Sequence, residues 1–487
     1  MSKKIIIIGS GIAGLSVALR LSRKGFKVKV LEKNSYVGGK VSEFKEKGYR
    51  FDMGPSLFTM PELVDELADK NNLRDNIFFK YLKLDIACRY FFNDGVLING
   101  YVDKQKFANE ASIKTSADPL KVIRYLNYIK FIYNTTSKIF IEKSLHKFST
   151  YFSFQTLIAF LKIPFLSIFK TMNATNIAFL KDSKIVQIFN RFATYNGSDP
   201  YIAPGILNVI AHLEFNKGVY LPENGMRSIV EFIYQLCLNS GVLFELNSQV
   251  TQISTDKNRV KGVYVNKVFY PADIVVSNID IYYVYNNLLD SNHYLPSRFK
   301  ISRSSSAIIF YWGINKVFEK LDLHNIFFAQ DYKREFQEIK LGKSIWQDPT
   351  IYVNITSKYI SNDAPNNCEN WFVMINVSHD TGQDWNSLIN DAKKIIIKKL
   401  NRVLDCNIEE NIEVENFIGP KEIEKNTGSF NGALYGTSSN SKMSAFLRHS
   451  NFSSKIKDLY FCGGTVHPGG GIPLALNSAK IVANEIN

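Results

Sequence analysis

Three glycines near the start of the chain have the spacing of a phosphate-binding turn. Gly9, Gly11 and Gly14 follow the β-branched run Ile5–Ile8, and apolar residues then repeat at helical spacing through Leu15–Leu19. The first glycine permits a tight turn, the second lets a phosphate approach the backbone, and the third lets the helix pack on the strand. We therefore expect a strand, a turn and a helix whose N-terminus faces the phosphates of a dinucleotide.

An acidic residue completes this arrangement at the expected distance. Gly25 ends the predicted helix, and residues 27–31 alternate as a second strand that delivers Glu32. A carboxylate at this position accepts hydrogen bonds from the ribose hydroxyls and disfavours a 2′-phosphate. The alternative, a glycine-rich turn without a ligand, does not account for the strand, the helix and Glu32 together.

A second glycine-rich loop lies close to the C-terminus. Residues 458–465 predict a strand that runs into Gly463 and Gly464, and Gly469–Gly471 then precede Pro473 and a closing helix over residues 474–486. Glycines before a helix start let backbone amides approach a flat ligand, and the helix N-terminus stabilises negative charge on it. His467 in this loop either is structural or lines the ligand pocket, and we assign it no proton-transfer role.

These loops resemble the two FAD half-sites of the flavin-containing amine oxidase and phytoene desaturase superfamily. Val37-Gly38-Gly39-Lys40 resembles its extended fingerprint, with Lys40 at a position where arginine is commoner, so that its contact is expected to be a point charge rather than a bidentate fork. His467-Pro468-Gly469-Gly470-Gly471 resembles the C-terminal signature of the carotenoid desaturases. The resemblance implies FAD as the cofactor, held by Gly9, Gly11, Gly14, Glu32, Gly38, Gly39, Lys40, Val250, Gly463, Gly464 and Pro473.

Motifs in the middle of the chain follow the same family in order. Residues 51–61 resemble the loop after the FAD fingerprint, residues 182–204 the substrate-domain signature, and residues 218–226 the return into the flavin domain. Ser248-Gln249-Val250 resembles the strand whose valine backbone meets adenine. For the substrate pocket this resemblance suggests four candidates, each polar one of which can instead be purely structural: Asp182, Arg191, Tyr195 and Trp312.

Within the family, the chain is most similar to the hydroxycarotenoid 3,4-desaturase branch. The loop Gly54–Pro61, the Lys40 variant and Phe310-Tyr311-Trp312-Gly313 carry this resemblance. It implies desaturation of a carotenoid, with 3,4-desaturation of a 1-hydroxycarotenoid expected. A hydride passes to the flavin, a proton leaves the adjacent carbon, and oxygen or a membrane quinone reoxidises the cofactor. Because a cation beside a polyene is delocalised, a strong catalytic base is not required.

Composition and charge indicate contact with a membrane surface. The net charge is +14, from 59 Lys and Arg against 45 Asp and Glu, which attracts anionic lipid or nucleic acid. No nucleic-acid module is recognisable. The region from Leu97 to Phe192 interleaves aromatic and aliphatic residues with lysine. Most of these residues form an ordinary core, but a polyene taken from a bilayer needs an apolar entrance with lysines at its rim.

The sequence predicts a cytoplasmic protein that binds to the inner face of the cell membrane. We find neither a signal peptide nor a transmembrane helix in the sequence. Five cysteines, far apart and never in a metal-binding spacing, fit reduced thiols and predict no metal site.

The length predicts more than one domain. We expect an α/β fold in which a discontinuous Rossmann-like FAD-binding domain combines residues 1–60, 215–285 and 430–487. Residues 61–214 are expected to form a helical domain that faces substrate and membrane, and residues 286–429 the sheet portion of the substrate domain.

Other functions of the same fold remain as alternatives. They are phytoene desaturation, carotenoid isomerisation or oxidation, amine oxidation, and the chaperoning of prenyl lipids without a flavin. The middle motifs argue against an amine oxidase, and the two intact half-sites argue against a chaperone.

Overall fold

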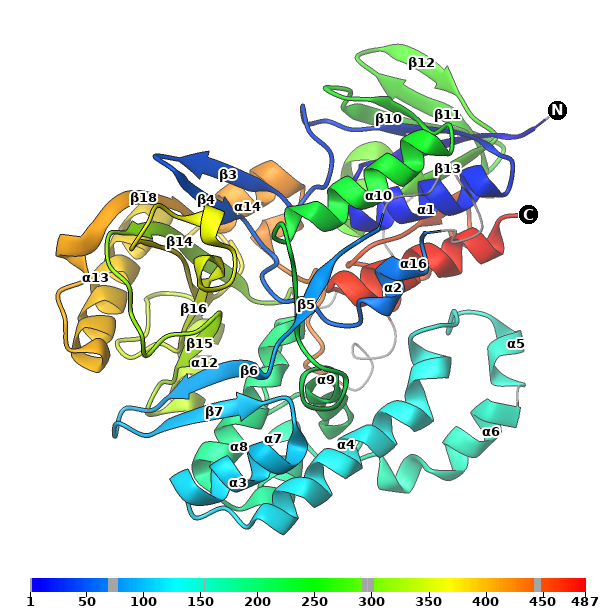
Figure 1. Cartoon of the computed structure of the whole chain (residues 1–487). Coiled ribbons are helices and arrows are strands. Elements are labelled where there is room, and N and C mark those ends of the chain that lie inside the picture. The colour runs from blue at the N-terminus through cyan, green and yellow to red at the C-terminus, as the bar shows by residue number, and fades with distance from the viewer. Residues whose placement is uncertain (1, 69–77, 153, 291–295, 297–301, 442–447) are drawn as a thin grey trace.

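The structure is a computed structural model of the whole chain. It describes every residue except 1, 69–77, 153, 291–295, 297–301 and 442–447. Two large sheets and a layer of helices make up the molecule (Figure 1).

The first large sheet is parallel and has the strand order β19–β13–β1–β2–β9. Each strand falls inside one of the three ranges that we assigned to the cofactor-binding domain. The strands are β1 (Lys4–Ile8), β2 (Lys27–Leu31), β9 (Leu243–Glu245), β13 (Ile274–Ser277) and β19 (Leu459–Phe461).

Alternation along β1 explains why both faces of this sheet are covered. Ile5 and Ile7 pack with α1 (Ile12–Arg23), α10 (Arg227–Asn239) and α16 (Ile472–Glu485). Ile6 and Ile8 face the opposite cluster, which includes an antiparallel sheet of β10 (Val250–Asp256), β11 (Arg259–Val265) and β12 (Val268–Pro271). A continuous apolar run is what a strand buried on both faces requires.

The second large sheet has seven strands in the order β18–β14–β17–β16–β15–β6–β7. All pairs are antiparallel except β15 with β6. The strands are β6 (Ile86–Phe91), β7 (Leu97–Tyr101), β14 (Ser306–Ile314), β15 (His324–Phe327), β16 (Ile351–Ile355), β17 (Glu369–Val377) and β18 (Ile412–Ile418).

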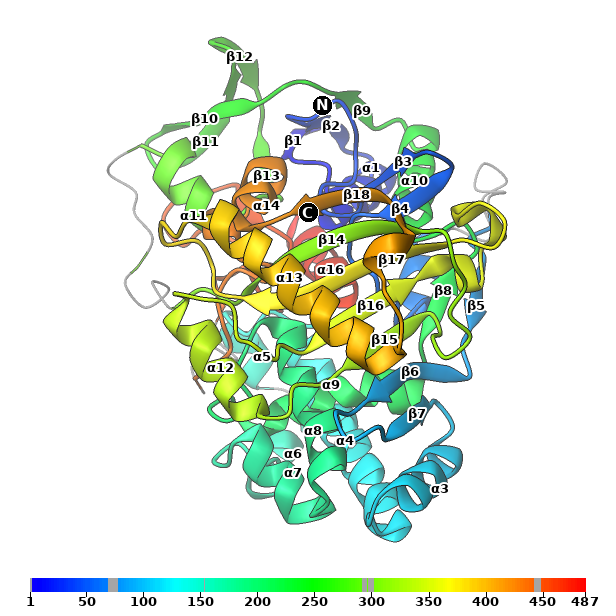
Figure 2. The same ribbon diagram turned by 90° about the vertical axis from the view of Figure 1, so that its left-hand side faces the viewer.

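The two faces of this sheet have different neighbours. Ile308, Phe310 and Trp312 of β14 belong to the core beneath α13 (Trp385–Leu404), which lies across β14 to β17 in Figure 2. Ile309 and Tyr311, one residue out of phase, belong to a separate cluster on the other face. Because successive side chains of a strand point to opposite faces, this parity decides which β14 residues reach the interior cavity.

A helical layer closes the molecule below the two sheets (Figure 1). Its helices are α3 (Lys104–Lys114), α4 (Pro119–Phe140), α5 (Phe148–Tyr151), α6 (Phe154–Leu161), α7 (Met172–Leu180), α8 (Ser183–Asn190) and α9 (Val209–His212), with the 3₁₀ segments η2 (Ile163–Phe165), η3 (Arg191–Asn196) and η4 (Gly205–Asn208) and the π-helix η5 (Leu213–Lys217). The main core of this layer contains Phe107, Tyr125, Phe189 and Phe215. A smaller cluster of Ile139, Leu145 and Ala159 joins α4 and α6.

Shorter elements connect these layers. The strands are β3 (Glu43–Glu46) paired with β4 (Tyr49–Asp52), and β5 (Tyr81–Lys83) paired with β8 (Tyr220–Pro222). The helices are α2 (Glu62–Asp65), α11 (Ile281–Tyr283), η6 (Val284–Leu288), α12 (Tyr332–Leu341), η8 (Thr356–Lys358), η9 (Ser361–Asp363), η10 (Glu409–Asn411), α14 (Pro420–Thr427) and η11 (Phe430–Gly432).

The predicted fold class, an α/β protein with a discontinuous Rossmann-like domain, is confirmed. One detail differs from the expected division of the chain. Strands β6 and β7 come from the range that we expected to be helical, yet β6 pairs with β15 and extends the large substrate-side sheet. Since β15 is more than two hundred residues away in the chain, no local sequence pattern predicts this pairing. The bounds of the three domains stay a prediction.

Candidate FAD and substrate site

A cavity of about 950 Å³ lies where the two large sheets and the helical layer meet. Among the predicted cofactor-binding residues, all but Gly14 line it. The cavity therefore joins the glycine turn at the N-terminus to the glycine loop at the C-terminus, although the two are separated by most of the chain.

The N-terminal turn has the geometry that its sequence predicts. Gly9 has a positive φ of +90°, and Gly11, which has no side chain of its own to cap the helix, is the N-cap of α1. A Cβ on Gly14 would lie 2.2 Å from the carbonyl oxygen of Gly9. Gly14 is thus required by the close packing of helix on strand and does not need to face the ligand.

Glu32 is held at the cavity wall by the turn itself. Its Oε2 accepts hydrogen bonds from the Ser10 backbone N at 2.8 Å and from Ser10 Oγ at 2.6 Å, and its Oε1 accepts from Asn34 N at 2.9 Å. The Ser248 backbone N donates to the carbonyl of Glu32 at 2.7 Å, which brings the start of β10 and Val250 to the same wall. These contacts fix the carboxylate where an adenosine ribose would meet it.

The C-terminal loop presents a second helix start to the cavity. Gly471, the N-cap of α16, has φ +101°, and a Cβ there would meet no atom within 4 Å. Neither an acidic residue in the first turn nor a side-chain cap occupies the amides of α16, and Pro473 stands in its first turn. Open amides at two helix N-termini fit an anionic, flat cofactor such as FAD.

Asn278 joins the two half-sites, and sequence reasoning did not single it out as a site residue. Its backbone N donates to Ile8 O at 2.8 Å. With its amide oxygen turned toward α1, the side chain accepts from Gly11 N at 3.1 Å and Gly14 N at 3.2 Å. A Cβ on Gly463 would lie 2.8 Å from the same amide. Its place directly after the end of β13 was the available signal.

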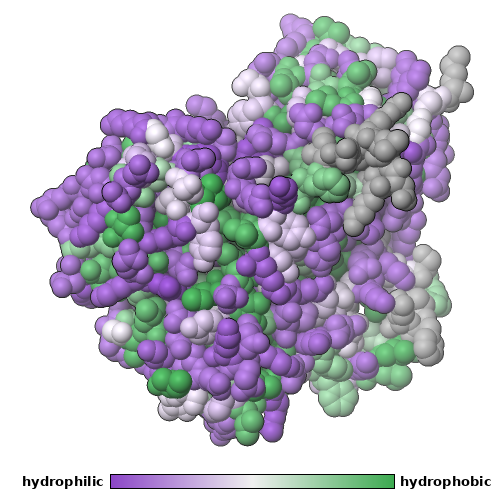
Figure 3. Space-filling view, viewed as in Figure 1, coloured by the Kyte–Doolittle hydropathy of each residue, from purple (hydrophilic) through white to green (hydrophobic). Residues whose placement is uncertain are grey.

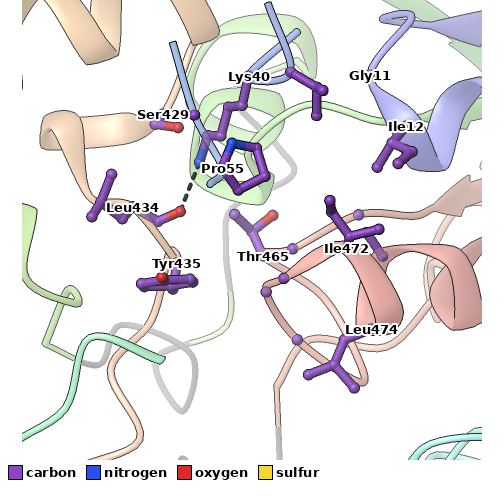
Figure 4. A pocket seen from close by; sticks show the side chains of 18 of the residues that line it. Gly11, Ile12, Lys40, Pro55, Ser429, Leu434, Tyr435, Thr465, Ile472 and Leu474 are labelled. Atoms are coloured by element: carbon purple, nitrogen blue, oxygen red, sulfur yellow. Dashed lines mark hydrogen bonds between the residues drawn. The ribbon is translucent and has the colours of Figure 1, made fainter. Parts of the chain in front are cut away.

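Lys40 crosses the middle of the cavity (Figure 4). Its Nζ donates to the carbonyl of Leu434 at 2.7 Å. The side chain keeps surface that is open to the cavity, but protein surrounds it on all sides, and this desolvation lowers the pKa of Lys40 to about 8; Asp280 opposes the shift and Arg303 adds to it. In Figure 4, Pro55, Tyr435, Thr465 and Ile472 surround the same space.

Arg191 and Tyr195 also line the cavity, within a buried polar network. Arg191 donates to Glu214 Oε2 at 3.0 Å, to Tyr195 OH at 2.6 Å and to Tyr90 OH at 3.2 Å. Tyr195 in turn donates to Glu214. Desolvation lowers the pKa of Arg191, but the interactions with Tyr195, Tyr90 and the Glu214 carboxylate outweigh it and keep that pKa well above the ordinary value. Glu214 carries no local motif, and sequence reasoning missed it.

The structure does not bring the other two substrate candidates to the cavity. Asp182 is the N-cap of α8, where it accepts from Lys184 N and Ile185 N at 3.0 Å each. Such capping explains an aspartate before a helix without any ligand. Trp312 is fully buried beneath α13, on the face of β14 opposite to Ile309, which does line the cavity. Neither residue lines the cavity, because Asp182 caps α8 and Trp312 points from β14 to the face opposite the cavity.

His467 lines the cavity and also makes a structural contact from the loop Gly463–Pro473. Its Nε2 lies 2.8 Å from the carbonyl of Lys143 and donates to it, which ties the loop to the segment between α4 and α5. Burial lowers the pKa of His467 to about 4, so the ring is neutral near pH 7.

Comparison with known proteins places the chain in a family. The model of the flavin-containing amine oxidoreductases matches residues 12–487. The chain belongs to this family. FAD is therefore its cofactor, as the two half-sites predict, and the protein is a flavin-dependent oxidoreductase.

Individual relatives support the branch that the motifs indicated. The chain is 50% identical over 485 residues to a 1-hydroxycarotenoid 3,4-desaturase of Flavobacterium sp. (strain P99-3), covering 99% of each chain. It is 30% identical to a 4,4'-diaponeurosporene oxygenase of Staphylococcus haemolyticus (strain JCSC1435), covering 100% of this chain and 97% of that one. A solved putrescine oxidase variant shares the fold at a TM-score of 0.64 and 14% identity, covering 100% of this chain and 98% of its own. The resemblance to the carotenoid desaturases is confirmed.

Replacing Glu32 tests the adenosine end of the site. We expect Glu32→Gln to weaken FAD binding by about 10-fold to 100-fold, the equivalent of losing about 1.5–3 kcal/mol of hydrogen bonding to a charged acceptor. Fluorescence titration of the apoprotein measures the Kd for FAD and for FMN, which lacks the adenosine ribose. The affinity for FMN should stay unchanged, as should both affinities in the surface variant Glu410→Gln. An equal loss for FAD and FMN would place Glu32 elsewhere in the site.

Removing one partner of the Arg191–Glu214 pair should destabilise the protein strongly. Both side chains are almost fully buried, so Glu214→Gln leaves an uncompensated guanidinium, at a cost of about 3–5 kcal/mol. The double variant Arg191→Met/Glu214→Leu should lose less than the sum of the two single variants.

The thermal midpoint of the FAD-loaded protein, taken at one scan rate, measures these differences. The exposed pair Lys261–Asp256 supplies the control, because Asp256→Asn should change stability by no more than about 0.5 kcal/mol. A Glu214→Gln protein as stable as this control contradicts the assignment.

Proposed function

We propose that this protein is a FAD-dependent carotenoid desaturase that forms the 3,4 double bond of a 1-hydroxycarotenoid. The observation that carries the proposal is the 50% identity, over 99% of both chains, to a protein named 1-hydroxycarotenoid 3,4-desaturase. The weaker identity to a 4,4'-diaponeurosporene oxygenase makes carotenoid oxidation the second candidate. Phytoene desaturation and carotenoid isomerisation are further outcomes that the assay below separates.

The cavity suits a long apolar substrate beside a flavin. Opposite the glycine loop, its wall is formed by Ile309, Phe372 and Met374 of the seven-stranded sheet. Toward the helical layer the wall continues with Phe140, Ile141, Leu145, Ile206, Leu207, Val209, Ile210 and Leu213. Apolar side chains on these sides bind a hydrocarbon and exclude water from the reacting bond.

Bound FAD would supply the acceptor for the hydride that leaves one of the two carbons. The turn at Gly9–Gly14 and the loop at Gly463–Pro473 would hold the cofactor, and the apolar cavity walls would position the substrate beside it. The hydroxyl of Tyr195, kept in place by Arg191 and Glu214, lies at the cavity wall. It is the polar group that we assign to the substrate pocket, where it can hold the departing proton by passing its own to Glu214.

Identifying the product tests the function directly. Purified, FAD-loaded protein is incubated with liposomes that contain a 1-hydroxycarotenoid, phytoene or a hydrocarbon carotene, and the pigments are separated by chromatography. The 1-hydroxycarotenoid should gain one conjugated double bond, with a red-shifted absorption and a mass lower by two hydrogens. A mass higher by oxygen supports the oxygenase, and conversion of phytoene with the hydroxycarotenoid unchanged contradicts the proposal. Repeating the assay without oxygen, with and without quinone in the bilayer, identifies the electron acceptor.

Membrane contact is the second part of the proposal. Large apolar side chains are exposed around α5, α6 and η2, among them Phe148 at 82%, Phe152 at 79%, Phe165 at 66% and Phe169 at 75%. In Figure 3 the hydrophobic surface at the lower right coincides with α5 and α6 of Figure 1. Lys147, Lys162 and Lys170 come from the same segment, whose charge favours an anionic bilayer.

The position of this surface relative to the cavity supports its role as the substrate entrance. Phe140 is the last residue of α4, and Ile141 and Leu145 lie between α4 and α5; all three line the cavity and precede the exposed aromatics in the chain. Among the described residues, no helix is both long and apolar enough to span a bilayer. We infer peripheral binding at the inner face of the cell membrane, where a polyene can pass from lipid to flavin.

Vesicle binding tests this surface. The triple variant Phe148→Ser/Phe152→Ser/Phe165→Ser should lower the affinity for anionic liposomes at least tenfold, since full burial of one phenylalanine contributes about 1.5–3 kcal/mol. Cosedimentation measures the bound fraction. The matched control changes three exposed apolar residues elsewhere, Val268→Ser/Leu243→Ser/Leu341→Ser, which are 59%, 62% and 60% exposed. Equal losses in the two triple variants would show that α5 and α6 are not the docking surface.

A further inference from the structure

Arg448 is a buried cation whose charge no described carboxylate neutralises. It is 4% exposed, lines the cavity and makes no ion pair among the described residues. Its Nη1 donates to the backbone carbonyls of Tyr435 at 2.8 Å and Gly464 at 3.1 Å, and its Nη2 lies 3.5 Å from Ser439 Oγ. Desolvation, assisted by the charge of Arg303, lowers the pKa of Arg448 to about 10, and the side chain is still cationic near pH 7.

The other buried arginines of the cavity region are paired differently. Arg191 has Glu214 at 3.0 Å, and Arg303 has Asp280 at 2.5 Å. Arg448 resembles Lys40 instead, because each donates to a backbone carbonyl. The Lys40 amino group donates to Leu434, and the Arg448 guanidinium donates to the next residue, Tyr435. Two unpaired positive charges therefore hold one short stretch of backbone at the edge of the cavity.

Burial of an unpaired charge costs several kcal/mol, and proteins retain it where an anion completes the site. FAD offers two negative centres, the pyrophosphate and the isoalloxazine ring after reduction. The contact of Arg448 with Gly464 places it on the C-terminal loop, beside the start of α16. The glycine turn that receives the pyrophosphate is the other half-site, at Gly9–Gly14. Bound FAD would therefore have its ring, rather than its pyrophosphate, nearer to Arg448.

We propose that Arg448, together with Lys40 and the N-terminus of α16, is the counter-charge for anionic reduced flavin and makes the bound flavin a stronger oxidant. Hydride transfer adds two electrons and one proton to the neutral oxidised ring, which leaves the ring with one negative charge. A site that binds this anion more tightly than the neutral ring raises the reduction potential by the same free energy. Hydride removal from a carbon chain without an activating nitrogen benefits from such an oxidant. The inference needs FAD but does not depend on which carotenoid is oxidised.

The affinities for oxidised and reduced flavin separate this role from others. In Arg448→Met the Kd for reduced FAD should rise at least tenfold more than the Kd for oxidised FAD. For a two-electron couple, this ratio equals a fall of about 30 mV in midpoint potential. Dye-equilibrated titration of the protein-bound flavin measures the potential without any carotenoid. Arg448→Lys should restore most of it, and the surface variant Arg402→Met should leave it unchanged. Equal weakening of both redox forms, with an unaltered potential, assigns Arg448 to the pyrophosphate and overturns the proposal.

The wild-type protein provides a second test that does not depend on the folding of a variant. An anionic reduced ring takes up one proton per two electrons, whereas a neutral reduced ring takes up two. The slope of the midpoint potential against pH should therefore be the one-proton slope even at slightly acid pH, where free reduced flavin is neutral. The ionisable groups that interact with Arg448 are Arg303 and His467, and Tyr435 contacts it through its backbone carbonyl. A two-proton slope there overturns the proposal.

Discussion

Parallel pairing of three strands is the constraint on which the site depends. β1, β13 and β19 lie side by side, although they come from the beginning, the middle and the end of the chain. Parallel strands end at the same edge of a sheet, so the turns that follow them meet there. The amides of α1 and α16 thereby reach one ligand, and Asn278, which follows β13 directly, bonds to the first turn from the position between them. Without this register neither glycine loop would be more than half of a site.

The seven-stranded sheet supplies what the parallel sheet cannot. A sheet covered by helices on one face and by β10–β12 on the other has no free apolar surface for a hydrocarbon. In the second sheet, α13 covers only one face of β14, so the opposite face can line a cavity. The two sheets therefore contribute different groups, because their faces are covered differently. The parallel sheet offers the cofactor backbone amides at its strand ends, and the second sheet offers the substrate side chains on an open face.

The parts of the site that sequence reasoning predicted are those whose signal is local. The turn Gly9–Gly14, Glu32 and the loop Gly463–Pro473 each combine residue type, spacing and neighbouring element within a short window, and all of them appear at the cavity. Trp312 shows where this approach ends. A tryptophan suits a hydrocarbon pocket, but a shift of one position along β14 turns a side chain from the cavity to the core. Because β14 is hydrophobic on both faces, the sequence does not show which face lines the cavity.

Single charged residues are the harder case. Asp182 has the appearance of a polar pocket residue, and only the backbone amides of Lys184 and Ile185 show that it caps a helix. Glu214 and Arg448 have no surrounding motif, because a buried charge is defined by partners that are distant in the chain. The same applies to β6, whose parallel partner β15 joins the sheet from far along the sequence. Such features become visible only when the fold has placed the partners.

The distribution of buried charge also connects the cofactor to the reaction. In the part of the cavity assigned to the substrate, Arg191 and Glu214 neutralise each other. The pocket therefore carries no net charge from this pair, which suits the binding of a hydrocarbon. Around the loop Gly463–Pro473, Lys40 and Arg448 bond to uncharged groups, and positive charge remains for the cofactor. A carbon–hydrogen bond of a polyene offers the protein no polar group to bind, so electrostatic stabilisation has to act on the flavin as it becomes negative. The Arg191–Glu214 pair and the two cations Lys40 and Arg448 therefore have complementary effects. The pair adds no net charge near the substrate, and the cations place positive electrostatic potential at the electron acceptor.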